Sequence, residues 1–315
     1  MRRIFHWLPR IAAATVFLLM ASLTVVAVVQ QRRGTAASVS VDQLIRAAGL
    51  RPDRIRIAVF EDQPGLGYLE NGRHAGFDVD IARMVARGLG YADDDRIEWH
   101  RMRNNIDRIL MLKNDQADLV IGSFSITDER KRDVAFAGPY LITEQGVLAS
   151  AEAGLTGVDD LRRPENRMCT VAGSTSERLL MTLGFPVTGL NGINECFDRL
   201  AAGDFVAIST DKTLLAGFDA RDPSRYQLLD LPPGEDGQPA VQERIGIGIR
   251  KDNIALRTLV DHLLDRIYRQ QQRGLTTDWQ RAYNAHLAAA TATSHQPPPD
   301  ERPELLDYDS KGPTR

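Results

Sequence analysis

Residues 54–60 read RIRIAVF and residues 78–89 read DVDIARMVARGL, which predicts a buried strand followed by a helix whose apolar residues recur at helical spacing. The order repeats with a strand at 96–102, a helix at 107–113 and the strand DLVIG at 118–122. Continuous apolar runs of this kind are typical of parallel strands that helices cover on both faces. The stretch therefore predicts an α/β fold.

A second α/β series follows a strand predicted at 139–149 and a loop with a short helix at 154–164. We expect its strands at 168–172, 186–190 and 205–209, and its helices at 175–183 and 193–202. After a loop rich in Pro and Gly, the chain continues with RIGIGIR at 244–250 and a long helix at 253–273. Two α/β lobes are the natural account of two such series.

The composition is that of an ordinary globular protein. The 315 residues are 43% hydrophobic and 26% charged, and the net charge is -3. That balance offers no basic surface of the kind that nucleic acids attract, which excludes nucleic acid as a partner. The sequence holds no P-loop, CxxC, HExxH or GxSxG motif, and its six His are scattered. We therefore expect no metal and no cofactor.

The N-terminus has the pattern of a membrane segment. Arg2, Arg3 and Arg10 precede an uncharged run of 19 residues at 11–29, which as a helix would rise about 28 Å, close to the thickness of the hydrocarbon layer. Because positive charge tends to stay in the cytoplasm, the rest of the chain is expected outside. We expect an uncleaved single-pass anchor, since VVAVVQQ at 25–31 lacks the small residues of a cleavage site. The alternative is a cleaved signal peptide, which would leave a secreted or periplasmic protein.

The only two cysteines, Cys169 and Cys196, lie in the part of the chain that is expected outside the cytoplasm. An exported chain with an even pair of cysteines normally joins them, because its compartment is oxidising. We therefore expect a disulfide, and two buried free thiols are the alternative.

Seven short segments carry a family pattern. They are GFDVD at 76–80, ADLVIG at 117–122, SITDER at 125–130, VAFAGPY at 134–140, GST at 173–175, ISTD at 208–211 and GIGIRKD at 246–252. In this order they resemble the polar amino-acid-binding members of extracellular solute-binding protein family 3, over about residues 55–287. The cysteine pair and STDKTLLAGF at 209–218 resemble in particular glutamine- and glutamate-binding members from actinobacteria.

The resemblance implies a periplasmic-binding-protein-like II fold, in which two crossover strands join two α/β lobes. Lobe 1 would take residues 41–141 plus 245–287, and lobe 2 residues 142–244. The remaining segments would be a cytoplasmic stub with the transmembrane anchor at 1–34, a tether at 35–40 and a tail at 288–315. The tail contains SHQPPPD and ends in charged and small residues, a composition that predicts disorder.

A zwitterion held away from water needs a fixed cation for its carboxylate and a fixed anion for its ammonium group. Arg130 lies where the family's carboxylate-binding arginine lies, and a guanidinium can grip both oxygens in a planar fork. Asp211 matches the acid that holds the α-ammonium group. The alternatives are an exposed arginine in the charged run DERKR for Arg130 and a helix cap for Asp211.

Four hydroxyl residues would complete the carboxylate site. The resemblance implies that Ser123 and Ser125 contribute backbone N–H and hydroxyl groups, although both can equally be plain turn residues. Ser174 and Thr175 follow a strand and open a helix, where free N–H groups and the helix dipole favour an anion. An ordinary N-cap is the other interpretation of this pair, and the two are compatible.

Specificity for one ligand would depend on the residue that faces the ligand's side chain. Arg108 lies near the position of an arginine that can face the ligand's side chain in acidic amino-acid binders, and a second cation would favour glutamate or aspartate over glutamine. An exposed helix arginine is the alternative. The chain also departs from the family pattern, with PGLGY at 64–68 in place of the usual aromatic segment and Ala172 in place of a basic residue.

The resemblance implies the substrate-binding component of an ABC-type amino-acid importer that binds glutamate, glutamine, aspartate or asparagine between its lobes. Its partners would be the ABC permease and ATPase subunits and, through the N-terminal helix, the membrane; a monomer is expected. The alternatives are a membrane-anchored amino-acid sensor and a dehydratase-like enzyme on the same fold. A catalytic version needs a positioned acid or base, and Glu61 and Asp62 have no feature that sets them apart from ordinary loop carboxylates. No enzyme activity is expected.

Overall fold

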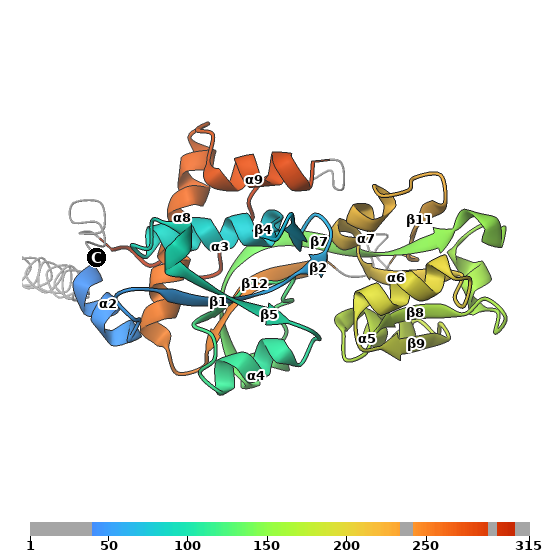
Figure 1. The fold of residues 1–315 in the computed structure, drawn as a ribbon, viewed down its shortest axis with the longest axis horizontal. Coiled ribbons are helices and arrows are strands. Elements are labelled where there is room, and N and C mark those ends of the chain that lie inside the picture. The colour runs from blue at the N-terminus through green and yellow to red at the C-terminus, as the bar shows by residue number, and fades with distance from the viewer. Residues whose placement is uncertain (1–39, 234–241, 289–294, 306–315) are drawn as a thin grey trace, which may run out of the picture.

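A computed structural model describes residues 40–233, 242–288 and 295–305. The chain forms two α/β lobes that lie side by side and are joined by long strands (Figure 1). The apolar run at 11–29 and most of the tether lie outside the described residues, so the predicted anchor does too. Within the described ranges, no helix is both long and apolar enough to cross a membrane.

Lobe 1 is built on a sheet with the strand order β5-β1-β6-β12-β7. Its strands are β1 (Ile55–Phe60), β5 (Ile97–Met102), β6 (Leu119–Val120), β7 (Val134–Ser150) and β12 (Gln242–Arg250). β1 pairs in parallel with both β5 and β6, as the apolar runs predicted, whereas β12 is antiparallel to β6. Every residue of β1 is buried, because helices cover both faces of this sheet.

Five helices surround that sheet. They are α2 (Val41–Ala48), α3 (Phe77–Gly88), α4 (Asp107–Lys113), α8 (Ile254–Gln272) and α9 (Asp278–His286). α2 packs on α8 and α3 packs on α9, whereas α4 covers the other face (Figure 1). Short 3-10 turns are η1 (Asp94–Arg96), η2 (Arg130–Arg132), η3 (Ala151–Ala153) and η4 (Val158–Arg162).

β7 is the element that links the lobes. Residues 134–144 of this 17-residue strand pair antiparallel with β12, and residues 145–150 pair with β10 and β11 in lobe 2. β12 runs beside β7 as far as Gln242, which pairs with Glu144. Two adjacent strands therefore carry the chain between the lobes, and a single sheet continues through both of them.

Within the described residues, lobe 2 has four strands of its own and three helices. The strands are β8 (Met168–Val171), β9 (Val187–Leu190), β10 (Ala207–Asp211) and β11 (Tyr226–Asp230); the helices are α5 (Thr175–Thr182), α6 (Ile193–Ala201) and α7 (Lys212–Asp219). Cys169 on β8 and Cys196 on α6 are joined in a disulfide with a Cα–Cα distance of 5.7 Å, which confirms the prediction. The bond fastens α6 to the sheet.

Several elements were not predicted. One of them is a small sheet of β2 (Asp62–Gln63), β3 (Gly67–Glu70) and β4 (Arg73–Ala75), whose short strands show no clear alternation of apolar and polar residues. Helix α9 and strand β11 were also missed, and β6 spans two residues where five were expected.

The tail differs from its prediction. Residues 295–305 are ordered against lobe 1, where the side chain of Gln296 is buried and donates to Leu264 O at 2.8 Å. Asp300 N donates to Gly138 O at 2.8 Å, and Leu305 packs into the core. Three consecutive prolines have little conformational entropy to lose, so a short polar segment can dock through a few contacts. The prediction of disorder does not hold for this part of the tail.

Candidate functional site

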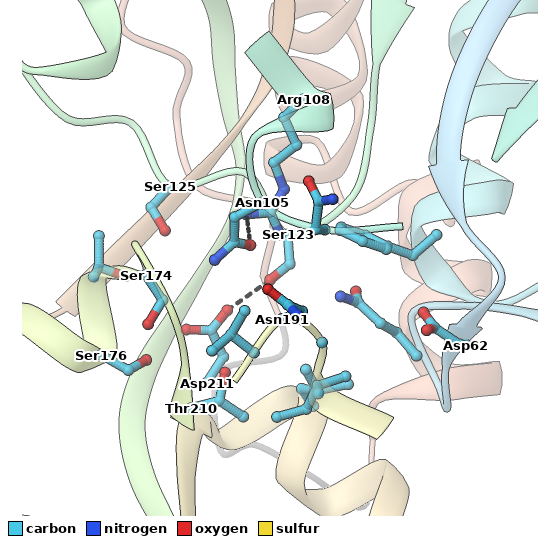
Figure 2. A pocket seen from close by; sticks show the side chains of 18 of the residues that line it. Asp62, Asn105, Arg108, Ser123, Ser125, Ser174, Ser176, Asn191, Thr210 and Asp211 are labelled. Carbon is cyan, nitrogen blue, oxygen red and sulfur yellow. Dashed lines mark hydrogen bonds between the residues drawn. The ribbon is translucent and has the colours of Figure 1, made fainter. Parts of the chain in front are cut away.

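A cleft lies between the two lobes and is partly open to solvent. All seven residues predicted for the site line it, together with thirteen others (Figure 2). The seven are Arg108, Ser123, Ser125, Arg130, Ser174, Thr175 and Asp211. The first four come from lobe 1 and the last three from lobe 2. The fold thus brings together residues that are up to 103 positions apart in the sequence, since 211 − 108 = 103.

Arg130 is the first residue of the 3-10 turn η2 and is 7% exposed. The alternative interpretation, an exposed arginine in the charged run DERKR, is therefore wrong. Its Nη1 donates to Ser125 O at 2.9 Å, and its guanidinium lies over the ring of Phe124 at 5.2 Å. Its other N–H groups make no hydrogen bond within the described part of the chain. Burial lowers the pKa of Arg130, the expected consequence of a cation without a paired anion.

Arg108 on α4 is 5% exposed, which rules out the exposed helix arginine. Its Nε donates to Gly122 O at 3.0 Å and its Nη1 to Asn105 Oδ1 at 2.7 Å. Burial first, and then the charge of Arg130, lower the pKa of Arg108 to about 9, so the group stays charged at neutral pH. Two buried guanidinium groups that repel each other create a site that an anion would stabilise.

Asp211 ends β10 and is the N-cap residue of α7 by position, but its side chain makes no capping hydrogen bond. It points into the cleft instead, where Oδ2 accepts from Ser123 Oγ at 2.6 Å (Figure 2). Its Oδ1 accepts from Gln145 Nε2 at 2.9 Å. Burial first, and then the charge of Glu243, raise the pKa of Asp211 to about 7. The helix-cap interpretation is therefore wrong for this side chain.

Ser123 is held in the left-handed region, with φ at 46°. Its N–H donates to Asp78 Oδ2 at 2.9 Å, and Tyr140 Oη donates to the other oxygen of the same carboxylate at 2.6 Å. Asp78 is 1% exposed and burial raises its pKa. A buried carboxylate thus fixes an uncommon backbone conformation and aims the Ser123 hydroxyl across the cleft at Asp211.

The other predicted hydroxyl residues, Ser125, Ser174 and Thr175, also line the cleft, and Figure 2 shows the first two of them. Ser174 is the N-cap of α5, since its Oγ accepts from Glu177 N at 3.0 Å, and Thr175 is the first residue of that helix. Ser125 forms an isolated β-bridge with Ile245. The N-cap interpretation is correct for Ser174, and Ser174 and Thr175 line the same cleft as Arg130.

The sequence did not single out several polar residues of the site. Asn105 Nδ2 donates to Ala172 O at 3.2 Å and so links the lobes directly. Asp62 and Gln63 line the cleft, and each has one buried oxygen without a hydrogen-bond partner among the described residues. Burial raises the pKa of Asp62. These residues lie in turns or two-residue strands, where no periodicity marks them.

The sequence matches one family over residues 55–281, described as bacterial extracellular solute-binding proteins, family 3. The chain belongs to this family. Members are binding proteins rather than enzymes, and they act outside the cytoplasm. The family resemblance predicted from the seven segments is confirmed, and so is the two-lobed α/β fold.

Similar proteins include the glutamate-binding protein GluB of Corynebacterium efficiens, 28% identical over 271 residues that make up 82% of this chain and 86% of that protein. A glutamine-binding protein of Geobacillus stearothermophilus is 34% identical over 190 residues, 60% of this chain and 68% of that protein. Among solved structures, a solute receptor for L-cysteine of Neisseria gonorrhoeae has a TM-score of 0.65 at 25% identity and covers 80% of this chain and 95% of that one.

Proposed function

We propose that this chain is the substrate-binding component of an ABC-type importer and that it binds a polar α-amino acid between its lobes. The observation that carries the proposal is the opposite charge of the two walls of one cleft. Arg108 and Arg130 are buried on the side of lobe 1, and Asp211 is buried on the side of lobe 2. A zwitterion is the ligand class that pairs with both walls.

The two ends of an α-amino acid fit different parts of this cleft. The carboxylate would take the unused N–H groups of Arg130 and the free backbone N–H groups at the start of α5. The ammonium group would take the place of Ser123 as a donor to Asp211. A bound ligand would thereby bridge the lobes and stabilise their closed arrangement, which a permease can recognise.

The side chain of the ligand would face Arg108 and Asn105. A buried cation favours glutamate or aspartate, whereas the amide of Asn105 also suits glutamine or asparagine. The relatives support the same group of ligands, since one is named for glutamate and another for glutamine. We place the folded part outside the membrane, held there by the apolar N-terminal segment.

The test is calorimetric titration of the full-length protein with glutamate, glutamine, aspartate, asparagine, arginine and histidine. We expect tight binding of an acidic or amide amino acid. Arg130→Ala should weaken that binding about ten- to a hundredfold, because a hydrogen bond to a charged group contributes about 1.5–3 kcal/mol. Arg132→Ala is the matched control, since Arg132 is an exposed arginine in the same turn. Near-native affinity in Arg130→Ala would contradict the proposal.

A further inference from the structure

Two buried polar residues stand where the lobes join and have no place in the ligand set above. Gln145 lies on β7 and Glu243 on β12, the two strands that connect the lobes. Their side chains are 4% and 5% exposed. A buried carboxylate is costly unless it is paired, so the position of Glu243 calls for an explanation.

Gln145 connects Glu243 to the candidate ammonium site. Its Nε2 donates to Asp211 Oδ1 at 2.9 Å and to Glu243 Oε1 at 3.1 Å, one hydrogen to each carboxylate. Its Oε1 accepts from Ser176 Oγ, on α5, at 2.6 Å. The amide therefore connects β10, β12 and α5 next to the cleft.

Chemistry fixes the orientation of this amide. The flipped rotamer would place Oε1 against two carboxylates and leave three acceptors without a donor between them, which is unfavourable in a buried site. In the observed orientation every group of the Gln145 amide has a partner. Asp211 therefore has one oxygen fixed by Gln145, and its other oxygen is directed to the cleft, where Ser123 reaches it.

Glu243 places a second negative charge behind Asp211. The hydrogen bond from Gln145 is the only one its carboxylate receives within the described chain, and it has no ion pair there. The charged groups that face Asp211 are Glu243 from β12, Arg108 from α4 and Arg130 from η2. A positive ligand group beside Asp211 would be attracted by both carboxylates.

We propose that Gln145 and Glu243 are positioning residues for the ammonium group of the ligand: Gln145 orients Asp211 toward the cleft, and Glu243 adds the charge that makes the site selective for a protonated amine. The proposal rests on the proposed amino-acid-binding function and deepens it. It predicts that the binding protein rejects dicarboxylates of the same length that lack the amine, such as 2-oxoglutarate, because a keto group brings neither a positive charge nor a hydrogen-bond donor to Asp211 and Glu243.

The network also predicts how binding depends on pH. Because burial and the charge of Glu243 raise the pKa of Asp211 to about 7, the empty site is partly protonated at pH 7. An ammonium group favours the ionised carboxylate, so binding near pH 7 should release a proton. Affinity should consequently rise as the pH increases from 5.5 to 8 and level off above the pKa of Asp211.

The two residues should shift this profile in opposite directions. Glu243→Gln removes a negative charge, which lowers the pKa of Asp211 and moves the rise in affinity to lower pH. Gln145→Met removes a donor to the ionised form, which raises the pKa of Asp211 and moves the rise to higher pH. We also expect each variant to bind about tenfold more weakly at pH 8.

The experiment is calorimetric titration of the full-length protein with glutamate and glutamine from pH 5.5 to 8, in two buffers of different ionisation enthalpy so that released protons are counted. Wild-type protein should release a fraction of a proton at pH 7, Glu243→Gln distinctly less and Gln145→Met distinctly more. Thr143→Val is the control: Thr143 is 3% exposed and lies opposite Glu243 in the pairing of β7 with β12, but its hydroxyl donates to Glu144 O and not to Gln145, Glu243 or Asp211. Its profile should match that of the wild type.

General damage to the fold would weaken binding without moving the pH profile in two directions. Wild-type profiles in both variants would overturn this inference alone, and so would shifts in the same direction. Tight binding of 2-oxoglutarate would also overturn it. Wild-type protein that binds no amino acid would overturn it together with the proposed function. If one variant fails to fold, the other still tests the inference, since each has its own predicted direction of shift in the pH profile of affinity.

Discussion

Lobe 1 and lobe 2 build opposite halves of one site by different means. Lobe 1 buries its two arginines against aromatic rings, with Arg130 over Phe124 and Arg108 between Phe60 and Phe124. Lobe 2 offers Asp211 and the start of α5, and its fold is fastened by a disulfide rather than by a ring of large helices. The aromatic rings hold each buried guanidinium in place through cation–π contacts. Asp211, at the end of a strand, is oriented by the residues that donate hydrogen bonds to it.

The disulfide should therefore matter more to lobe 2 than to lobe 1. Cys169 and Cys196 are 27 residues apart, and closing a loop of that length contributes about 3.5 kcal/mol of stability in the chain-entropy account. We expect C169A/C196A to lower the free energy of unfolding by about that amount in urea titrations. Hydrogen exchange should rise in β8 and α6 and stay near wild type in β1 and α3.

Reduction of the wild-type protein should reproduce the effect, and the same reductant should leave the stability of the variant unchanged. An equal loss of hydrogen-exchange protection in both lobes would contradict a larger role of the disulfide in lobe 2, because it would show that the lobes unfold as one cooperative unit.

Most of the fold could be predicted because it depends on long, regular patterns. The apolar runs of β1 and the helical spacing of α3 locate both elements within one residue of their ends in the structure. A two-residue strand such as β2 has too few positions for a period to show. The docked tail could not be predicted either, since its composition says nothing about whether a complementary surface exists.

The residues of the site also differ in whether the sequence could predict them. Arg130 and Asp211 lie in segments with a family pattern, so their convergence on one cleft could be predicted, although their binding role stays a prediction. Gln145 lies within a long buried strand, where a polar residue gives no sign of its partners. Those partners are 66 and 98 positions away along the chain, at Asp211 and Glu243, and only the tertiary structure brings them together.

The two arginines of lobe 1 should play different roles. Arg108 should distinguish between ligand side chains, whereas Arg130 should contribute to the binding of every α-amino acid ligand. Arg108→Gln should weaken binding of glutamate about tenfold more than binding of glutamine, since only the acid loses a charge-assisted hydrogen bond. The measurement is calorimetric titration of both ligands into both proteins.

Lys113→Gln is the matched control, because Lys113 is an exposed cation at the end of the same helix. An equal loss for glutamate and glutamine would assign Arg108 to the carboxylate end, beside Arg130, and would remove it from the side-chain site.

The smallest effect is expected at the rim of the cleft, where the lobes also meet. Arg178 on α5 pairs with Glu129, beside Arg130, at 2.5 Å, but the two side chains are 45% and 56% exposed. Exposed ion pairs contribute about 0–1 kcal/mol, so a double-mutant cycle of R178A and E129A on ligand affinity should give a coupling below about fivefold. The coupling should vanish in 1 M salt, where the Debye length falls to about 3 Å. A coupling above about tenfold that survives in salt would mean that the rim, and not the buried charges at the centre, holds the lobes together.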